Sequence, residues 1–233
     1  MKDLFGKALL DYYHGNHSEN LMTSTSISDE DELPLSYLFR SFKDMPKIEQ
    51  KALKLCKGKT LDVGCGSGSH SLYLQKKGLE VKAIDVSKGA VEVAKLRGVK
   101  TVELKNILDE TGTYDTVLLL MNGTGIFQEL SQTQKYLKHL KNILNKNGKI
   151  LIDSSDIKYM YEDEDGGIWQ DLNSTYYGEL DYFLSYKGTD EQPMKWLYLD
   201  FETFKTQCSA VGLKCNLILE GPHFDYLAML TIK

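Results

Sequence analysis

From residue 60 to residue 153, short apolar runs alternate with segments whose apolar side chains recur at helical spacing. The apolar runs predict strands, and the segments between them predict helices. The expected strands cover residues 60–63, 80–84, 100–104, 114–121 and 149–153, and the expected helices cover 69–77, 88–97 and 132–144. This alternation predicts an α/β fold in which helices cover both faces of a largely parallel sheet.

The flanking segments have other patterns. Residues 1–58 predict an N-terminal helical cap, with Met22–Glu32 as a polar loop or mobile lid. Residues 154–199 hold seven of the 14 tyrosines and both tryptophans, and apolar side chains alternate over 180–186 and 194–198, which predicts a β-hairpin. Residues 200–233 predict a helix to Gly212 and two closing strands, 213–219 and 226–232. We therefore expect one domain with segments 1–58, 59–153, 154–199 and 200–233.

Composition and charge narrow the class of protein. The chain has 233 residues, 42% of them hydrophobic, and a net charge of −5, which argues against a surface for duplex nucleic acid. The four cysteines form no C-x-x-C pair, so no zinc site or disulfide framework is predicted. The first residues contain no signal-peptide pattern, and no apolar run approaches the ~20 residues of a membrane span. We expect a cytoplasmic protein with no membrane partner.

The candidate chemistry centres on a glycine-rich turn. Residues 62–68 read Asp-Val-Gly-Cys-Gly-Ser-Gly, between an expected strand and an expected helix. Such a turn points backbone N–H groups at a ligand, and glycine lets the ligand approach the backbone. Dinucleotide-binding enzymes use G-x-G-x-x-G, but Ser69 occupies the position of the last glycine here. A nicotinamide-linked, NAD(P)-dependent oxidoreductase is therefore the less favoured alternative.

The D-x-G-x-G-x-G run of residues 62–68 resembles motif I of the class I S-adenosylmethionine-dependent methyltransferases. The resemblance implies a Rossmann-like three-layer α/β/α sandwich. Its mostly parallel, seven-stranded sheet has an antiparallel last strand, here with the helical cap and the hairpin insertion added. It implies S-adenosyl-L-methionine as cofactor, held by residues of the loop and of the following strand ends. These residues are Asp62, Gly64, Cys65, Gly66, Gly68, Asp85, Val86, Asn106, Ile107, Met121 and Asn122.

Asp85 is the most specific of the predicted contacts outside the loop. It follows Gly64 by 21 residues and ends the next expected strand, where a carboxylate can accept hydrogen bonds from both ribose hydroxyls. The alternative role is a helix N-cap, for which Ser87 is the better candidate. Asn106 stands where the family more often has Asp, against adenine, and a turn-forming role competes with that assignment. Met121 and Asn122 are expected to border the sulfonium.

Methyl transfer from a sulfonium is an in-line displacement, in which alignment supplies much of the rate. The sequence therefore predicts no particular catalytic residue. His14, Trp169 and Tyr177 are candidate substrate contacts, and Asp153 and Asp156 could also line the pocket. No metal is expected, since His14 and His17 lack a third ligand and the acidic run 162–167 lacks the ligands of a calcium loop.

The expected partner is a small-molecule acceptor, with a protein side chain as a further possibility. Nucleic-acid acceptors are disfavoured because residues 122–125, Asn-Gly-Thr-Gly, do not resemble the Asn-Pro-Pro-Tyr motif of amino-group methyltransferases, and the chain is acidic. The alternative function is a non-catalytic S-adenosylmethionine-binding protein, which would bind the cofactor without turnover.

Overall fold

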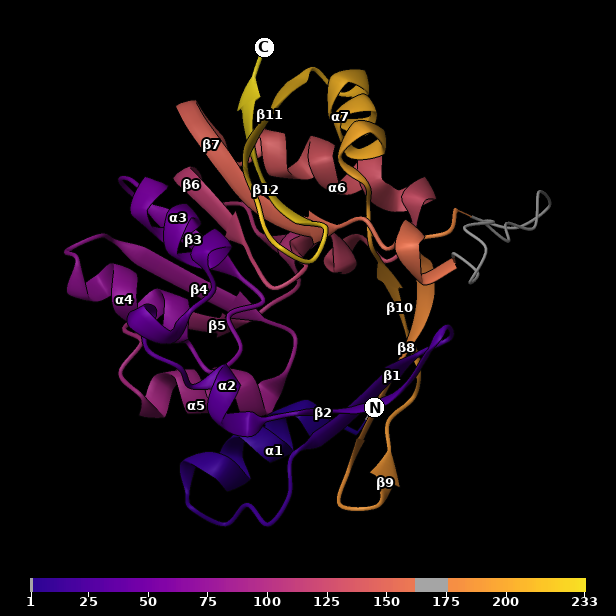
Figure 1. Cartoon of the computed structure of the whole chain (residues 1–233). Coiled ribbons are helices and arrows are strands. Elements are labelled where there is room, and N and C mark those ends of the chain that lie inside the picture. The colour runs from indigo at the N-terminus through magenta and orange to yellow at the C-terminus, as the bar shows by residue number, and fades with distance from the viewer. Residues whose placement is uncertain (1, 162–175) are drawn as a thin grey trace.

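A seven-stranded sheet forms the centre of the molecule, in the order β11-β12-β7-β6-β3-β4-β5 (Figure 1). The computed structural model describes residues 2–161 and 176–233. The strands are β3 (Thr60–Val63), β4 (Val81–Asp85), β5 (Val102–Leu104), β6 (Tyr114–Leu119), β7 (Leu144–Ser155), β11 (Leu213–Glu220) and β12 (Asp225–Ile232). Strands β5, β4, β3, β6 and β7 are parallel, whereas β12 runs antiparallel to both of its neighbours. The expected fold class is confirmed.

Helices cover both faces of this sheet because its buried strands are apolar on both sides. In β6, Val117 and Leu119 face one core with Leu137 and Phe204, whereas Leu118 faces the other core with Ala52. The helices on the first face are α6 (Leu130–Asn142) and α7 (Phe201–Ala210). Those on the second face are α3 (Lys47–Leu55), α4 (Ser69–Lys76) and α5 (Lys88–Leu96). The result is the three-layer arrangement that the alternating pattern predicts.

A second sheet joins the N-terminal segment to the insertion, in the order β10-β8-β1-β2, with the short β9 paired to β8. Its strands are β1 (Leu21–Thr25), β2 (Ser28–Leu33), β8 (Glu179–Tyr186), β9 (Thr189–Asp190) and β10 (Met194–Leu197). The predicted hairpin is therefore present. The prediction of a loop or mobile lid over Met22–Glu32 was wrong, because most of this segment lies in β1 and β2, where β1 pairs with β8 at Met22↔Ser185.

The cap packs on the main domain through α1 (Leu4–Tyr13). Asp3 accepts from the amide of Gly6 at 2.9 Å and so caps α1, and it also accepts from the Ser87 hydroxyl and the Gly89 amide. Leu9 of α1 is buried with Leu184 of β8 and Val93 of α5. The cap also includes the short helices α2 (Leu35–Leu38) and η1 (Phe42–Asp44). The N-terminal segment is therefore a mixed helix and hairpin layer, fixed to the main domain by the packing of α1 on α5.

Three short 3-10 helices complete the described chain: η2 (Ile107–Asp109), η3 (Gly123–Phe127) and η4 (Lys158–Tyr161). The pattern did not predict η3, which directly follows β6. Strand β7 begins at Leu144, five residues before the predicted start, because Leu144 already pairs with Tyr114 of β6. Among the described residues, every helix is too short or too polar to cross a membrane.

Candidate active site

The glycine-rich loop leaves β3 at the carboxyl edge of the sheet with three residues in the left-handed region. Gly64, Gly66 and Gly68 have φ of +70°, +51° and +84°. A Cβ on Gly64 or Gly66 would meet no other atom closer than 3.5 Å, whereas a Cβ on Gly68 would lie 2.7 Å from Val99. The first two glycines therefore leave open space beside the backbone, as a bound ligand requires, and the third allows α4 to pack closely on its neighbours.

Polar contacts hold the loop against α2. The hydroxyls of Ser67 and Ser69 donate to the carbonyl of Leu38, the latter at 3.0 Å. The guanidinium of Arg97 donates to the carbonyl of Ser67 at 2.8 Å and to both serine hydroxyls. Ser69, which replaces the last glycine of the dinucleotide pattern, thus joins the cap to the loop.

Asp62 and Cys65 face away from this open space. Asp62 is 2% exposed, and its carboxylate accepts from the Ser71 hydroxyl at 2.6 Å, which fixes the first turn of α4. Burial raises the pKa of both side chains. The Cys65 thiol packs with Ala83 and Val91 in a buried cluster. Asp62 therefore stabilises the loop from its buried side, and only the backbone of Cys65 can face a ligand there.

Asp85 lies next to the loop, as the spacing predicted. Its carboxylate accepts from the amide of Gly66 at 2.9 Å and from the amide of Ser87 at 2.8 Å. Ser87 is itself the N-cap of α5, so Asp85 is not the cap. Burial raises the pKa of Asp85, while these backbone donors lower it. The neighbouring Val86 is 72% exposed, an unusual exposure for an apolar side chain beside an open glycine loop.

Asn106 and Ile107 follow β5 on the same edge of the sheet. The side-chain oxygen of Asn106 accepts from the Leu108 amide at 2.9 Å and caps η2. The turn-forming role proposed as the alternative for Asn106 is therefore present in the structure. Ile107 is 4% exposed and belongs to the main core, so its side chain points away from solvent.

Met121 and Asn122 form a strained turn after β6. Their φ values are +68° and +59°, which are uncommon for residues other than glycine. The carboxylate of Asp153, near the end of β7, accepts from the Met121 amide at 3.1 Å and from the Gly123 amide at 2.8 Å. The Asn122 side chain donates to the Leu197 carbonyl of β10 at 3.2 Å. Met121, 38% exposed, is thus the side chain of this pair left open to a ligand.

We expect affinity for the cofactor that the motif implies, S-adenosylmethionine, to fall about tenfold between pH 7.5 and pH 5, with a midpoint near pH 6. Burial raises the pKa of Asp153 to about 6, although the amides of Gly123, Asn122 and Met121 favour its ionised form. Protonation of Asp153 below pH 6 would place a carboxyl O–H close to these N–H donors, and the lost hydrogen bonds would loosen the turn. Calorimetric titration across this pH range measures the effect.

The matched variant is Asp153→Asn, which cannot ionise. It should bind with an affinity close to that of the acidic wild-type protein, and without the step near pH 6. An identical pH profile in both proteins would show that another group causes the change.

The structure does not bring the predicted substrate contacts together. His14 is exposed at the C-terminal end of α1. The other end of α1 is the one near the glycine loop, because its N-cap Asp3 bonds to Ser87 there. Trp169 and the acidic run 162–167 lie outside the described residues. Tyr177 donates to Asp156 at 2.8 Å, and its ring lies 4.5 Å from that of Tyr176. Tyr177 and Asp156 therefore form part of a local polar cluster.

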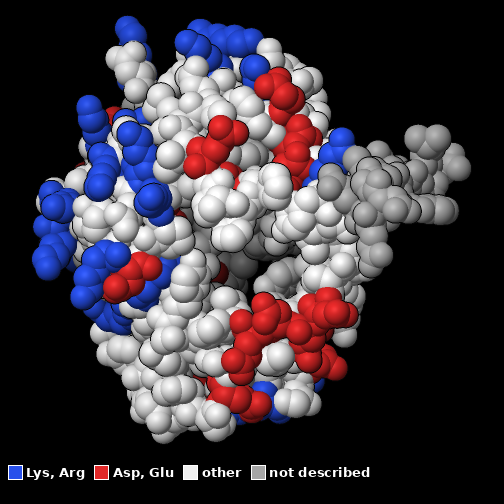
Figure 2. Space-filling view, in the orientation of Figure 1, with Lys and Arg blue, Asp and Glu red and all other residues white. Residues whose placement is uncertain are grey.

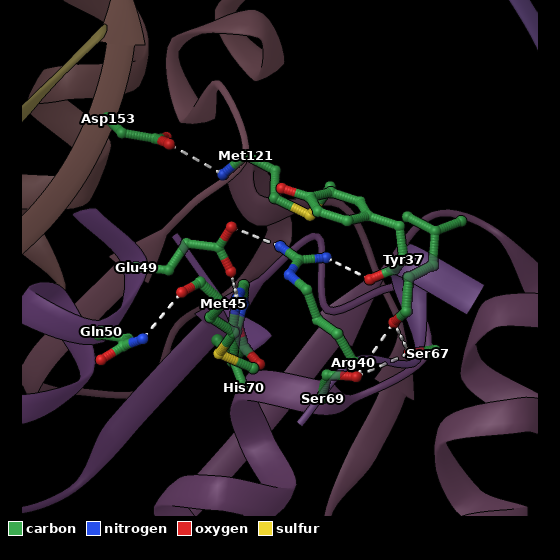
Figure 3. A network of polar contacts seen from close by, with 12 residues as sticks. Tyr37, Arg40, Met45, Glu49, Gln50, Ser67, Ser69, His70, Met121 and Asp153 are labelled. Carbon is green, nitrogen blue, oxygen red and sulfur yellow. Dashed lines mark hydrogen bonds and ion pairs between the residues drawn. The ribbon is translucent and has the colours of Figure 1, made fainter. Parts of the chain in front are cut away.

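A buried ionic cluster beside the loop was missed by the sequence analysis (Figure 3). Arg40 pairs with Glu49, whose other oxygen lies 2.8 Å from Nε2 of His70. These residues are 8%, 4% and 8% exposed. Glu49 keeps a lowered pKa: burial acts to raise it, but the contacts with His70 and Arg40 prevail. No local spacing joins a loop, α3 and α4, so only the tertiary fold reveals the cluster.

An aromatic pair of the second sheet lies beside η3. Tyr182 of β8 and Trp196 of β10 have ring centroids 5.6 Å apart. The indole of Trp196 fills the position that a Cβ of Gly125 would take. Figure 2 shows a hollow between the main sheet and the second sheet, with acidic side chains along its lower rim.

The described residues contain no group of three or more His, Cys, Asp or Glu side chains arranged to hold a metal ion.

Comparison with known proteins shows a close likeness to a solved methyltransferase along nearly the whole chain. The structure superposes with a TM-score of 0.93 on an S-adenosylmethionine-dependent methyltransferase from Bacteroides fragilis, solved in complex with S-adenosyl-L-homocysteine. The two chains are 45% identical, over 99% of this chain and 95% of the other. Residues 61–152 also match a family model described as a methyltransferase domain.

Two curated relatives match over 113 residues, which is 46% of this chain. One, from Campylobacter fetus, is named ribosomal protein L11 methyltransferase and is 35% identical. The other, from Rickettsia conorii, is named ubiquinone biosynthesis O-methyltransferase and is 28% identical. The match spans 38% of the length of each relative. One name refers to a ribosomal protein and the other to ubiquinone biosynthesis.

Proposed function

The chain belongs to the S-adenosylmethionine-dependent methyltransferases, and on this basis we propose that it methylates a small molecule bound in the hollow between its two sheets. The cofactor is S-adenosyl-L-methionine, so the NAD(P)-dependent alternative is set aside. The acceptor is a proposal, because the relatives' names include both protein and small-molecule acceptors.

We place the cofactor along the carboxyl edge of β3, β4, β5 and β6, where ligands of open α/β sheets bind. The open space beside Gly64 and Gly66 fits the methionine part, and Asp85 fits the ribose hydroxyls. Exposed Val86 fits a flat base, with the backbone of Asn106 and Ile107 beyond it. Met121 fits the sulfonium end.

In methyl transfer, the main tasks of the protein are to align the reacting groups and to exclude water. When bound, the cofactor supplies a methyl group on a sulfonium, and transfer to an acceptor leaves S-adenosylhomocysteine. The strained turn at Met121 is held by Asp153, whose oxygens already accept backbone N–H groups. Asp153 is therefore a positioning group, and a rigid site of this kind gains rate through proximity.

The observation that carries the small-molecule proposal is the attachment of the second sheet to the site. The Leu197 carbonyl of β10 accepts from both the Asn122 side chain and the Thr124 hydroxyl, at 3.2 and 3.0 Å. These bonds hold the aromatic wall of Tyr182 and Trp196 beside the turn that borders the reaction centre. A recessed site with an aromatic wall suits a compact acceptor.

A labelling experiment tests the proposal. Protein and methyl-tritiated S-adenosylmethionine are incubated with two fractions of a cell extract, one below about 3 kDa and one macromolecular. We expect label to enter the low-mass fraction, and the Gly66→Ala variant to abolish the transfer. Label in precipitated protein would replace the small molecule with a protein acceptor. Tight cofactor binding with no transfer in either fraction would support the non-catalytic alternative.

A further inference from the structure

Tyr37 extends from α2 across the ionic cluster toward the turn after β6 (Figure 3). The carbonyl of Leu38, the next residue, accepts from the hydroxyls of Ser67 and Ser69. This contact fixes the C-terminal end of α2 on the glycine loop. The backbone of Tyr37 therefore has a fixed position relative to the glycine loop.

Arg40 holds the Tyr37 ring. Its guanidinium carbon lies 3.8 Å from the ring centroid, and its Nη1 donates to the Tyr37 carbonyl. Glu49 pairs with the guanidinium through one oxygen, and His70 contacts the other oxygen of Glu49. A planar guanidinium stacked on a ring and fixed by an ion pair restricts the ring to one orientation.

The free end of Tyr37 lies where the reaction centre is expected. In Figure 3 the ring extends toward Met121, and the hydroxyl makes no hydrogen bond to the other residues drawn. Burial raises the pKa of Tyr37, the Arg40 charge opposes this, and the charges of Glu49, Asp153 and Asp225 add to it. The hydroxyl is thus neutral and carries lone pairs that can accept a hydrogen bond.

We propose that the Tyr37 hydroxyl contacts the methyl-bearing end of the cofactor, between the glycine loop and Met121. This inference rests on the cofactor placement proposed above. A neutral hydroxyl presents its oxygen lone pairs to the positive charge of the sulfonium and its methyl group. It is then a catalytic residue that aligns the methyl group, and Arg40, Glu49 and His70 are positioning residues that act through it.

The test compares two cofactor analogues, so that no acceptor is required. S-adenosylhomocysteine lacks the transferable methyl group and its charge, whereas sinefungin carries a protonated amine in place of the methyl-bearing sulfonium. The Kd of each is measured by calorimetry for the wild-type protein and for Tyr37→Phe. The control variant is Tyr73→Phe, whose ring stacks on Phe42 with centroids 4.0 Å apart.

We expect Tyr37→Phe to weaken sinefungin binding about tenfold more than S-adenosylhomocysteine binding, because only the amine donates to the hydroxyl oxygen. Tyr73→Phe should leave the ratio of the two Kd values unchanged. An unchanged ratio in Tyr37→Phe overturns the inference, whether the two affinities stay constant or fall together. Failure of the wild-type protein to bind either analogue would overturn the cofactor placement instead.

Discussion

Replacing Asp85 with asparagine is expected to lower the affinity for S-adenosylhomocysteine roughly 100-fold, because hydrogen bonds to a charged acceptor contribute about 1.5–3 kcal/mol each. The Asp85 carboxylate already accepts from the amides of Gly66 and Ser87. A carboxylate has further lone pairs for two ribose hydroxyls. The asparagine amide has one acceptor atom, so it loses contacts with the ribose and with the loop together.

An analogue of S-adenosylhomocysteine that lacks the ribose 2′ hydroxyl separates these two losses. Removing the hydroxyl should weaken binding to the wild-type protein about tenfold and have little effect on binding to Asp85→Asn. Thermal unfolding should show that the variant stays folded, with unfolding free energy lower by about 1–3 kcal/mol. If the two proteins lose affinity equally on removal of the hydroxyl, Asp85 does not contact the ribose.

The loop glycines give the second large effect, as a matched pair of variants. Gly66→Ala should weaken S-adenosylhomocysteine binding by about 100-fold while costing about 1 kcal/mol of unfolding free energy. The reason is geometric: a Cβ on Gly66 would meet only Phe5, at 3.9 Å, and would therefore project into the space assigned to the cofactor.

Gly68→Ala should behave in the opposite way. Its Cβ would collide with Val99 at 2.7 Å and crowd Ala94 at 3.2 Å, so unfolding free energy should fall by about 2–4 kcal/mol. Both glycines have positive φ, which makes the backbone cost common to the two variants. Chemical denaturation and calorimetric titration of both variants measure the contrast. If the two variants lose the same affinity and have the same stability, Gly66 does not face the ligand in a way that Gly68 does not.

The main sheet could be predicted from the sequence because its strands are buried on both faces. Such strands can be apolar at successive positions, and in β6 Val117, Leu118 and Leu119 are all apolar and fully buried. The carboxyl ends of β3 and β4 follow from the same pattern, and with them the glycine loop and Asp85. Local sequence was sufficient wherever local burial determined the residue types.

The second sheet could not be predicted in full, because β2 is exposed along most of its length. Its residues Asp29 to Glu32 are acidic and exposed, and such residues are depleted in strands. This segment forms strands because β2 pairs with β1, and β1 pairs in turn with β8, more than 150 residues away along the chain. The Arg40–Glu49–His70 cluster was missed for the same reason, since its contacts come from three separate segments.

The pairing of β1 with β8 also sets an order of events during synthesis. Residues 21–25 leave the ribosome early, but their partner strand, residues 179–186, is made only in the last quarter of the chain. The five parallel strands β3 to β7 are complete by residue 155 and make mostly sequential contacts. We therefore expect the nascent chain to fold its cofactor-binding half first. The wall that shields the reaction centre would form last, once the insertion joins the first strand.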